Sequence, residues 1–259
     1  MSRPLAVLAA VVALVGCGAE SPSAAPATGS AGSTPSTTLT VFAAASLKTT
    51  FTTLGQQFEA AHAGTTVTFN FAGSADLVAQ LQQGAPADVF AAADTKNMDL
   101  VTADDLVSGT PVTFATNTLE IAVPPDNPAA IRSFADLTKP GVTLVVCAPA
   151  VPCGAAARKI ETATGTTLTP VSEESAVTDV LNKVQTGEAD AGLVYVTDVR
   201  NAAGKVTGVP FPEARGAVNV YPIAPIAASK HADLASEFTK LVTGPDGRKV
   251  LTDAGFGLP

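Results

Sequence analysis

Two serines follow buried-looking strands at points where small residues crowd the chain. Ser46 comes after the apolar run 41–45, and Ser74 comes after the alternating run 66–72 and Gly73. Apolar residues then recur at helical spacing behind each serine, which predicts a helix N-cap at both positions. The first N–H groups of a helix lack internal partners and carry the positive end of the helix dipole. Serine hydroxyls beside such N–H groups are typical of a site for an anion.

A third junction of small residues lies at Cys153–Gly154, at the predicted start of another helix. In parallel α/β sheets, ligands bind at the carboxyl ends of strands, where helix N-termini converge. Small side chains would let backbone N–H groups approach a compact tetrahedral oxyanion, which needs many hydrogen-bond donors. A simpler interpretation stays open, because a serine cap stabilises a helix by about 1 kcal/mol whatever the function.

The pattern of elements around these junctions predicts an α/β fold. Strand-like runs at 38–45, 66–72 and 87–94 alternate with helical patterns, and the alternation resumes from residue 116 to the strand that ends at Tyr195. Such alternation is typical of parallel βαβ units. We expect two lobes, residues 38–115 plus 223–259 and residues 116–222, joined by extended crossovers near 115–119 and 218–222. One continuous doubly wound sheet is the alternative.

Composition limits the classes of partner. The chain has 259 residues, of which 46% are hydrophobic and 15% charged, so it can bury a sizeable core. Its formal net charge of −8 argues against a broad basic surface for nucleic acid. The spacing of Cys147 and Cys153 is not typical of zinc sites, and the chain has only two histidines, so no metal-ion site is expected.

The N-terminal residues predict export. The apolar run 5–16 is too short to span a bilayer but suits a signal peptide, and it ends in Leu14-Val15-Gly16-Cys17, which resembles a bacterial lipobox. We expect a signal peptide over 1–17, lipid on Cys17 and a flexible linker over 18–37 that reaches about 25 Å. An ordinary secretory signal is the alternative. With Cys17 lipidated, Cys147 and Cys153 remain as a possible disulfide pair in an oxidising compartment.

Four segments occur in an order that resembles a known family. They are "VFAAASL", "FAGSADLVAQLQQGAPADVFAAAD", "VPCGAAARKIE" and "GEADAGLVYVTD". Together they resemble the molybdate-binding proteins of bacterial ABC transporters, which are group II periplasmic binding proteins, and the likeness runs from about residue 38 to 259. The resemblance implies two Rossmann-like α/β lobes with a ligand cleft between them. It also implies a monomeric solute-binding protein, not an enzyme, that has no cofactor and delivers its ligand to a membrane permease from the cell surface.

The same resemblance implies the binding residues. Family members hold the oxyanion with two serine hydroxyls, which match Ser46 and Ser74, and with a tyrosine hydroxyl, which matches Tyr195. The two backbone donors match Cys153 and Val177. The family often has alanine in place of Cys153, a change that a backbone donor tolerates. Molybdenum would enter only as the bound oxyanion, molybdate or tungstate.

The chemistry of the ligand agrees with this set of donors. Molybdate and tungstate are dianions without a proton at neutral pH, so they offer only acceptors, whereas phosphate often carries a proton that needs an acceptor. Asp76 is expected to serve the helix start instead of a ligand, and Tyr221 is expected to belong to the crossover. Sulfate, phosphate and ferric iron are the alternative ligands. A secreted hydrolase with Cys153 or Ser46 as nucleophile is a remote alternative, because His62 and His231 lie in peripheral stretches and no G-x-S-x-G motif is present.

Overall fold

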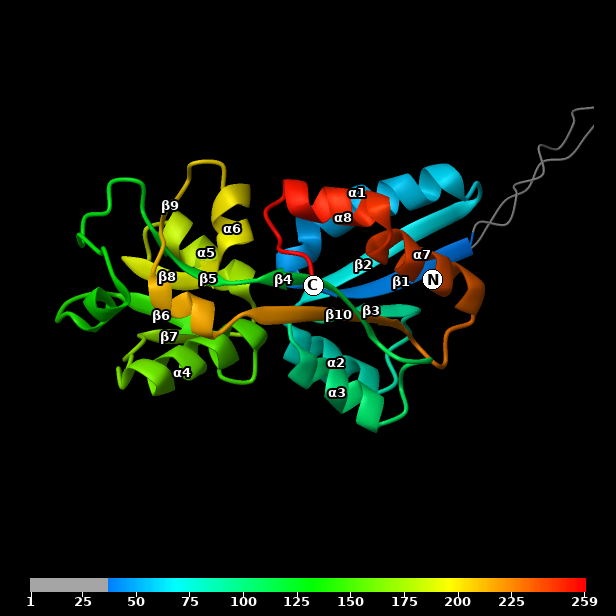
Figure 1. Ribbon diagram of the computed structural model, residues 1–259, viewed down its shortest axis with the longest axis horizontal. Coiled ribbons are helices and arrows are strands. Elements are labelled where there is room, and N and C mark those ends of the chain that lie inside the picture. The colour runs from blue at the N-terminus through cyan, green and yellow to red at the C-terminus, as the bar shows by residue number, and fades with distance from the viewer. Residues whose placement is uncertain (1–36) are drawn as a thin grey trace, which may run out of the picture. The chain divides into compact units, whose positions relative to one another are not determined.

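The computed structural model describes residues 37–259, which belong to one compact unit with two separate sheets (Figure 1). The predicted signal peptide 1–17, the lipidation site Cys17 and the linker up to residue 36 lie outside the described residues. Thr37, the last residue of the predicted linker, is already the first residue of a strand. Among the described helices, none combines the length and the apolar character needed to cross a bilayer.

The first sheet has the strand order β2-β1-β3-β10-β4. β1 runs parallel to β2 and β3, whereas β10 runs antiparallel to both β3 and β4. Helices α1, α7 and α8 cover one face and α2 and α3 the other, so the core of this lobe forms two apolar clusters (Figure 1). The bounds are β1 Thr37–Ala44, β2 Thr65–Ala72, β3 Val89–Ala91, β4 Val112–Asn117, β10 Asn219–Pro225, α1 Lys48–Ala61, α2 Ser74–Gln82, α3 Thr95–Ala103, α7 Ala232–Thr243 and α8 Pro245–Asp253.

The second sheet has the order β7-β6-β8-β5-β9, and a single apolar cluster forms its core. β6 runs parallel to β7 and β8, and β5 runs antiparallel to β8 and β9. Its elements are β5 Leu119–Val123, β6 Leu144–Cys147, β7 Ser172–Glu174, β8 Ala191–Tyr195, β9 Thr207–Val209, α4 Pro152–Thr164, α5 Val177–Gln185 and α6 Val196–Asn201. Three short 3-10 helices complete the described chain, η1 Ala45–Leu47, η2 Phe134–Thr138 and η3 Pro212–Gly216.

Two lobes of α/β structure are therefore confirmed, and the alternative of one continuous sheet is wrong. The chain leaves the first sheet through β4, which leads into β5 of the second sheet, and it returns through β10 (Figure 1). Because β10 runs antiparallel to β4, the first sheet contains strands of both directions. β4 and β10 pair up to Asn117 and Asn219, so residues 116–117 and 219–222 lie within the first sheet. The boundaries between the two lobes that the sequence predicts, at residues 115/116 and 222/223, remain a prediction.

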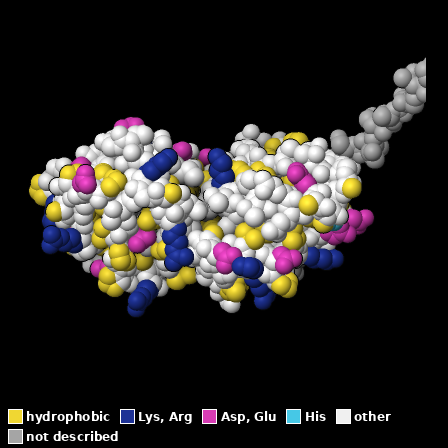
Figure 2. Space-filling model, turned by 90° about the horizontal axis from the view of Figure 1, so that it is seen from above, with side chains coloured by type: hydrophobic (Ala, Val, Ile, Leu, Met, Phe, Trp, Pro, Cys, Tyr) yellow, Lys and Arg dark blue, Asp and Glu magenta, His cyan; other side chains and the backbone are white. Residues whose placement is uncertain are grey.

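Charged side chains are spread over the face of the molecule that Figure 2 shows. On the face shown in Figure 2, Lys and Arg side chains alternate with Asp and Glu and do not gather into one patch of a single sign.

Candidate functional site

All five predicted site residues line one small cavity at the carboxyl ends of β1, β2 and β8. The cavity, counted with the space that is open to solvent, measures about 200 Å³. The first sheet contributes the segments around Ser46 and Ser74, and the second contributes Tyr195 and the starts of α4 and α5 at Cys153 and Val177. The remaining lining residues are small or apolar: Ala44, Ala45, Ala72, Gly73, Ala93, Val151 and Pro152.

The small residues let the two lobes approach closely at this point. A Cβ atom on Gly73 would lie 1.9 Å from the backbone oxygen of Ser175, which belongs to the segment between β7 and α5. No side chain larger than hydrogen fits there. Glycine is required at position 73 by this contact and not by its backbone angles, since its φ of −59° and ψ of 140° suit any residue.

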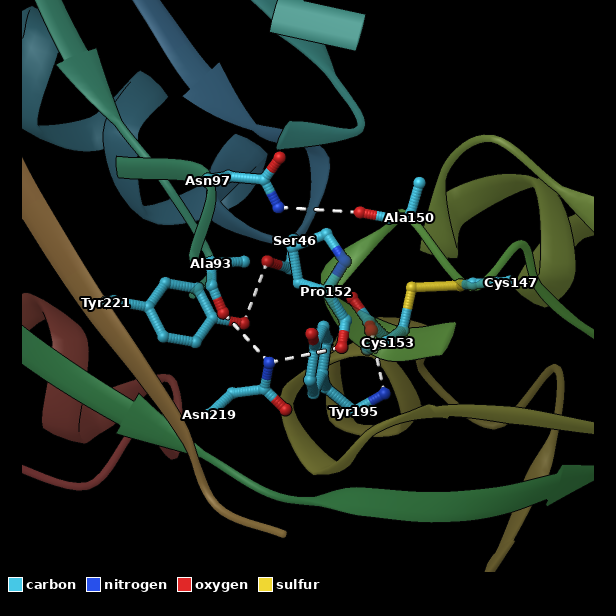
Figure 3. The surroundings of a disulfide bond; sticks show 11 residues. Ser46, Ala93, Asn97, Cys147, Ala150, Pro152, Cys153, Tyr195, Asn219 and Tyr221 are labelled. Atoms are coloured by element: carbon cyan, nitrogen blue, oxygen red, sulfur yellow. Dashed lines mark hydrogen bonds between the residues drawn. A yellow bond between two sulfur atoms is a disulfide. The ribbon is translucent and has the colours of Figure 1, made fainter. Parts of the chain in front are cut away.

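Ser46 is not a helix cap, contrary to the sequence prediction. It lies inside η1, whose N-cap is Ala44, and α1 begins only at Lys48. The extra 3-10 turn moves Ser46 away from the cap position. Its hydroxyl instead forms a 3.1 Å hydrogen bond with the hydroxyl of Tyr221 (Figure 3).

Ser74 also does not cap its helix, because Gly73 is the N-cap of α2 and Ser74 is the first helical residue. The Ser74 oxygen accepts a hydrogen bond of 3.0 Å from the backbone N–H of Ala93. That bond occupies a lone pair and leaves the hydroxyl hydrogen available. Ser74 is buried and lines the cavity, so its hydroxyl can donate this hydrogen to a ligand there. Asp76 lies in the first turn of α2, as expected, and does not line the cavity.

Tyr195 ends β8 with its side chain only 1% exposed. Its buried hydroxyl has no hydrogen-bond partner among the described residues. Burial raises the pKa of both Tyr195 and Tyr221, so both phenols stay protonated and remain donors. A buried donor without a partner costs free energy, and such a group next to a cavity is typical of a ligand site.

Tyr221 is expected from the sequence to belong to the crossover, and it lies in the strand by which the chain returns to the first sheet, without lining the cavity. It lies in β10, fully buried, with its hydroxyl on Ser46. The two residues are 175 positions apart, and no local pattern links them.

The two predicted backbone donors lie at helix starts. Cys153 is the second residue of α4, after Pro152, and Val177 is the first residue of α5. N–H groups in the first turn have no intrahelical acceptor and point toward the helix N-terminus, here the cavity. A disulfide joins Cys147 at the end of β6 to Cys153 and closes the turn between them (Figure 3).

Hydrogen bonds beside the cavity connect the two lobes. The Asn219 Nδ2 atom of β10 donates to the carbonyl of Ala93 at 2.9 Å and to that of Pro152 at 3.3 Å (Figure 3). The Asn97 Nδ2 atom of α3 donates to the Ala150 carbonyl at 3.5 Å. These bonds hold the turn that carries Cys153 against the first lobe.

Asp198 introduces a pH-dependent group beside the site. It is buried and accepts a 2.9 Å hydrogen bond from the backbone N–H of Tyr195, and burial raises its pKa from 3.8 to about 7. The folded protein therefore holds a proton that the unfolded chain loses above pH 4.

We expect the free energy of unfolding to fall as pH rises from about 4 to about 7, by up to about 1.4 kcal/mol per pH unit from this group. The sign follows because the folded state binds more protons than the unfolded state in this range. Asp198→Asn keeps an acceptor for Tyr195 and cannot titrate, so it should flatten this part of the profile. Urea unfolding between pH 4 and 8 measures the effect. An unchanged slope in the variant would show that Asp198 is ionised when folded.

The described residues offer little for other kinds of site. No group of three or more His, Cys, Asp or Glu side chains in residues 37–259 is placed to hold a metal ion. Neither His62 nor His231 lines the cavity. His62 instead pairs with Glu237, and His231 lies beside Asp88. Among residues 37–259, Cys147 and Cys153 form a disulfide, so this part of the chain offers no free thiol, and no imidazole lines the cavity for nucleophilic catalysis.

A larger cavity, of about 1000 Å³ with the space open to solvent included, lies at the opposite end of β1. Its lining includes Thr38, Asp88 and His231 but none of the predicted site residues. The smaller cavity is the better candidate because buried donors converge on it.

Comparisons with known proteins place this architecture in a family. The family model of bacterial extracellular solute-binding proteins matches residues 39–257. The chain belongs to this family. The molybdate-binding protein ModA of Mycobacterium tuberculosis (strain ATCC 25618 / H37Rv) is 54% identical over 249 residues, which cover 96% of this chain and 94% of that protein.

Solved structures share the fold of this solute-binding protein. The periplasmic molybdate-binding protein of Azotobacter vinelandii matches with a TM-score of 0.75 at 23% identity, over 85% of this chain and 99% of that chain. The sulfate-binding protein SubI from Mycobacterium tuberculosis H37Rv matches with a TM-score of 0.70 at 21% identity, over 85% of this chain and 86% of that chain. Similar folds thus occur in proteins named for different oxyanions, and the fold alone does not select the ligand. Membership of the family places the protein outside the cytoplasm.

Proposed function

We propose that this solute-binding protein captures molybdate in the cavity between its lobes and delivers it to an ABC importer. The observation that carries the proposal is the chemistry of the cavity lining. It offers serine and tyrosine hydroxyls and helix-start N–H groups, and none of its twelve lining residues is acidic. A dianion without a proton needs donors and no acceptor, and the high identity to ModA supports the same ligand.

In this proposal the ligand is held by Ser46, Ser74, Tyr195 and the backbone N–H groups of Cys153 and Val177. The three hydroxyls and two N–H groups come from both lobes, so the ligand links the lobes and favours their closure by a hinge motion. A membrane permease would then recognise the closed form. Tungstate has nearly the same size and charge as molybdate, and we propose that it binds with similar affinity. The site needs no cofactor, because capture and release involve no covalent chemistry.

Titration calorimetry on the folded chain with molybdate, tungstate, sulfate and phosphate tests the ligand. We expect tight binding of molybdate and tungstate. Phosphate should bind most weakly at neutral pH, because its proton meets no acceptor in the cavity. A response to sulfate or phosphate, with no heat from molybdate and no competition by it, would overturn the assignment.

We further propose that the protein acts as a monomer tethered to the membrane by lipid on Cys17. The motif Leu14-Val15-Gly16-Cys17 supports this anchor. Intact mass spectrometry of the protein from its own cell should give a chain that starts at residue 17 and carries the added mass of a diacylglycerol group. A mature chain that starts elsewhere, without lipid, would contradict the anchor, and light scattering on the soluble part tests the monomer.

A further inference from the structure

We propose that Tyr221 is a positioning residue for the oxyanion, which acts through Ser46. Its phenol donates a hydrogen bond to the Ser46 oxygen and so directs the single hydrogen of Ser46 into the cavity. The inference rests on the proposed function and adds a residue to it that does not touch the ligand.

The contact between the two hydroxyls is buried and specific. Ser46 Oγ and the Tyr221 hydroxyl oxygen lie 3.1 Å apart, and the two side chains are 5% and 0% exposed (Figure 3). Ser46 lines the cavity, whereas Tyr221 does not. Any effect of the Tyr221 hydroxyl on a ligand in the cavity must therefore pass through a neighbour, and Ser46 is its hydrogen-bond partner.

The direction of this hydrogen bond decides what Ser46 can do. Each hydroxyl has one hydrogen to donate. If Ser46 donated to Tyr221, only oxygen lone pairs of Ser46 would face the cavity, and they would repel an anion. A phenol is a stronger donor than an aliphatic hydroxyl, and the raised pKa of Tyr221 keeps its proton in place. Tyr221 as donor also polarises the Ser46 hydroxyl, because hydrogen bonds in a chain strengthen one another.

Packing of the Tyr221 ring holds its hydroxyl oxygen in place beside Ser46. It makes edge-to-face contacts with Phe114, Tyr195 and Phe256, at centroid distances of 6.2, 6.1 and 5.5 Å. Its strand, β10, lies between β3 and β4 in the sheet. Removing only the hydroxyl leaves these ring contacts intact, so Tyr221→Phe isolates the hydrogen bond from the packing.

A double-mutant cycle with molybdate as the titrated ligand tests the inference. The chains are wild type, Tyr221→Phe, Ser46→Ala and the double variant. We expect Tyr221→Phe to weaken binding about tenfold, the size of one lost hydrogen bond to a group that contacts a charge. In the Ser46→Ala background the same change should alter affinity by less than about twofold, because the hydrogen bond between Tyr221 and Ser46 is already gone.

Thr239→Val is the matched control. Thr239 in α7 is also buried, and its hydroxyl donates to the Ala235 carbonyl at 2.8 Å, away from the cavity. It should bind molybdate as wild type does. Thermal unfolding of each ligand-free chain shows whether the variants are folded. A chain with 3,5-difluorotyrosine at position 221 has a stronger hydrogen-bond donor on a similar ring. Below the pKa of this phenol, it should bind molybdate at least as tightly as wild type does.

The possible results distinguish a failure of the proposed function from a failure of the proposed role of Tyr221. If wild type binds no molybdate, the proposed function fails and this inference fails with it. If wild type binds and Tyr221→Phe binds equally well, only the inference is overturned. Full additivity of the two substitutions would overturn it too, since Tyr221 would then act independently of Ser46.

Discussion

Gly73→Ala is expected to weaken ligand binding strongly while the ligand-free chain stays folded. The added Cβ would meet the backbone oxygen of Ser175 at 1.9 Å, and a backbone atom cannot rotate out of the way as a side chain can. The backbone angles at Gly73 suit alanine, so the first lobe itself is not strained. The lobes can relieve the clash only by separating.

Separation of the lobes would withdraw the donors at Cys153, Val177 and Tyr195 from a ligand held at the serines. Each hydrogen bond to a charged ligand is worth about 1.5–3 kcal/mol, so the affinity for molybdate should fall at least about 100-fold. Calorimetry measures the loss, and small-angle scattering with and without molybdate reports whether the chain still closes.

Gly216→Ala is the control for this glycine substitution. It lies in η3, and a Cβ atom there would meet nothing within 4 Å. Its affinity should match that of wild type. Wild-type affinity in Gly73→Ala would mean that binding does not need the close approach of Gly73 to Ser175.

The second large effect is expected from Ser46→Ala combined with Ser74→Ala. Each substitution removes a buried hydroxyl that faces the cavity, and each bond to the anion is worth about 1.5–3 kcal/mol. Binding should therefore weaken about 10–100-fold for each serine and about 10²–10⁴-fold for the pair, if the two effects add. Competition titration against molybdate measures the change.

Both serines also support the fold, so stability must be measured alongside. Loss of the Ser74 oxygen leaves the Ala93 N–H without its 3.0 Å partner, and loss of Ser46 leaves the Tyr221 hydroxyl without one. Unfolding of the ligand-free variants separates this cost from the loss of binding. Ser133→Ala is a suitable control, because Ser133 caps η2 and does not line the cavity. Retention of wild-type affinity in the double variant would remove the serines from the site.

The difference between the predicted and observed positions of the two serines relative to their helices has a simple physical origin. A serine ahead of an apolar helical pattern is the usual sign of an N-cap, and the helices do follow as predicted. The pattern does not distinguish a cap from a residue one or two positions inside the first turn. That small shift matters here, since a capping serine uses its oxygen on its own helix, whereas Ser46 and Ser74 bond to Tyr221 and Ala93 of other strands or loops.

The sequence by itself determined the alternation of strands and helices, and it contains the residue types and the family pattern that point to an oxyanion. It also predicts an export signal. These depend on residues close together in the chain, where periodicity and turn chemistry act. The convergence of five predicted residues on one cavity was implied by family resemblance and became a geometric fact only in the structure.

Only the tertiary structure decided the contacts between distant segments. The Tyr221–Ser46 hydrogen bond, the fit of Gly73 against Ser175 and the Asn219 bonds to Ala93 and Pro152 all join parts of the chain far apart in sequence. Such contacts depend on how two sheets and their connections place the strand ends, and this placement is set by packing of the whole core. The hydrogen-bond donors could be identified in the sequence. The residues that position these donors and allow the two lobes to approach each other could not.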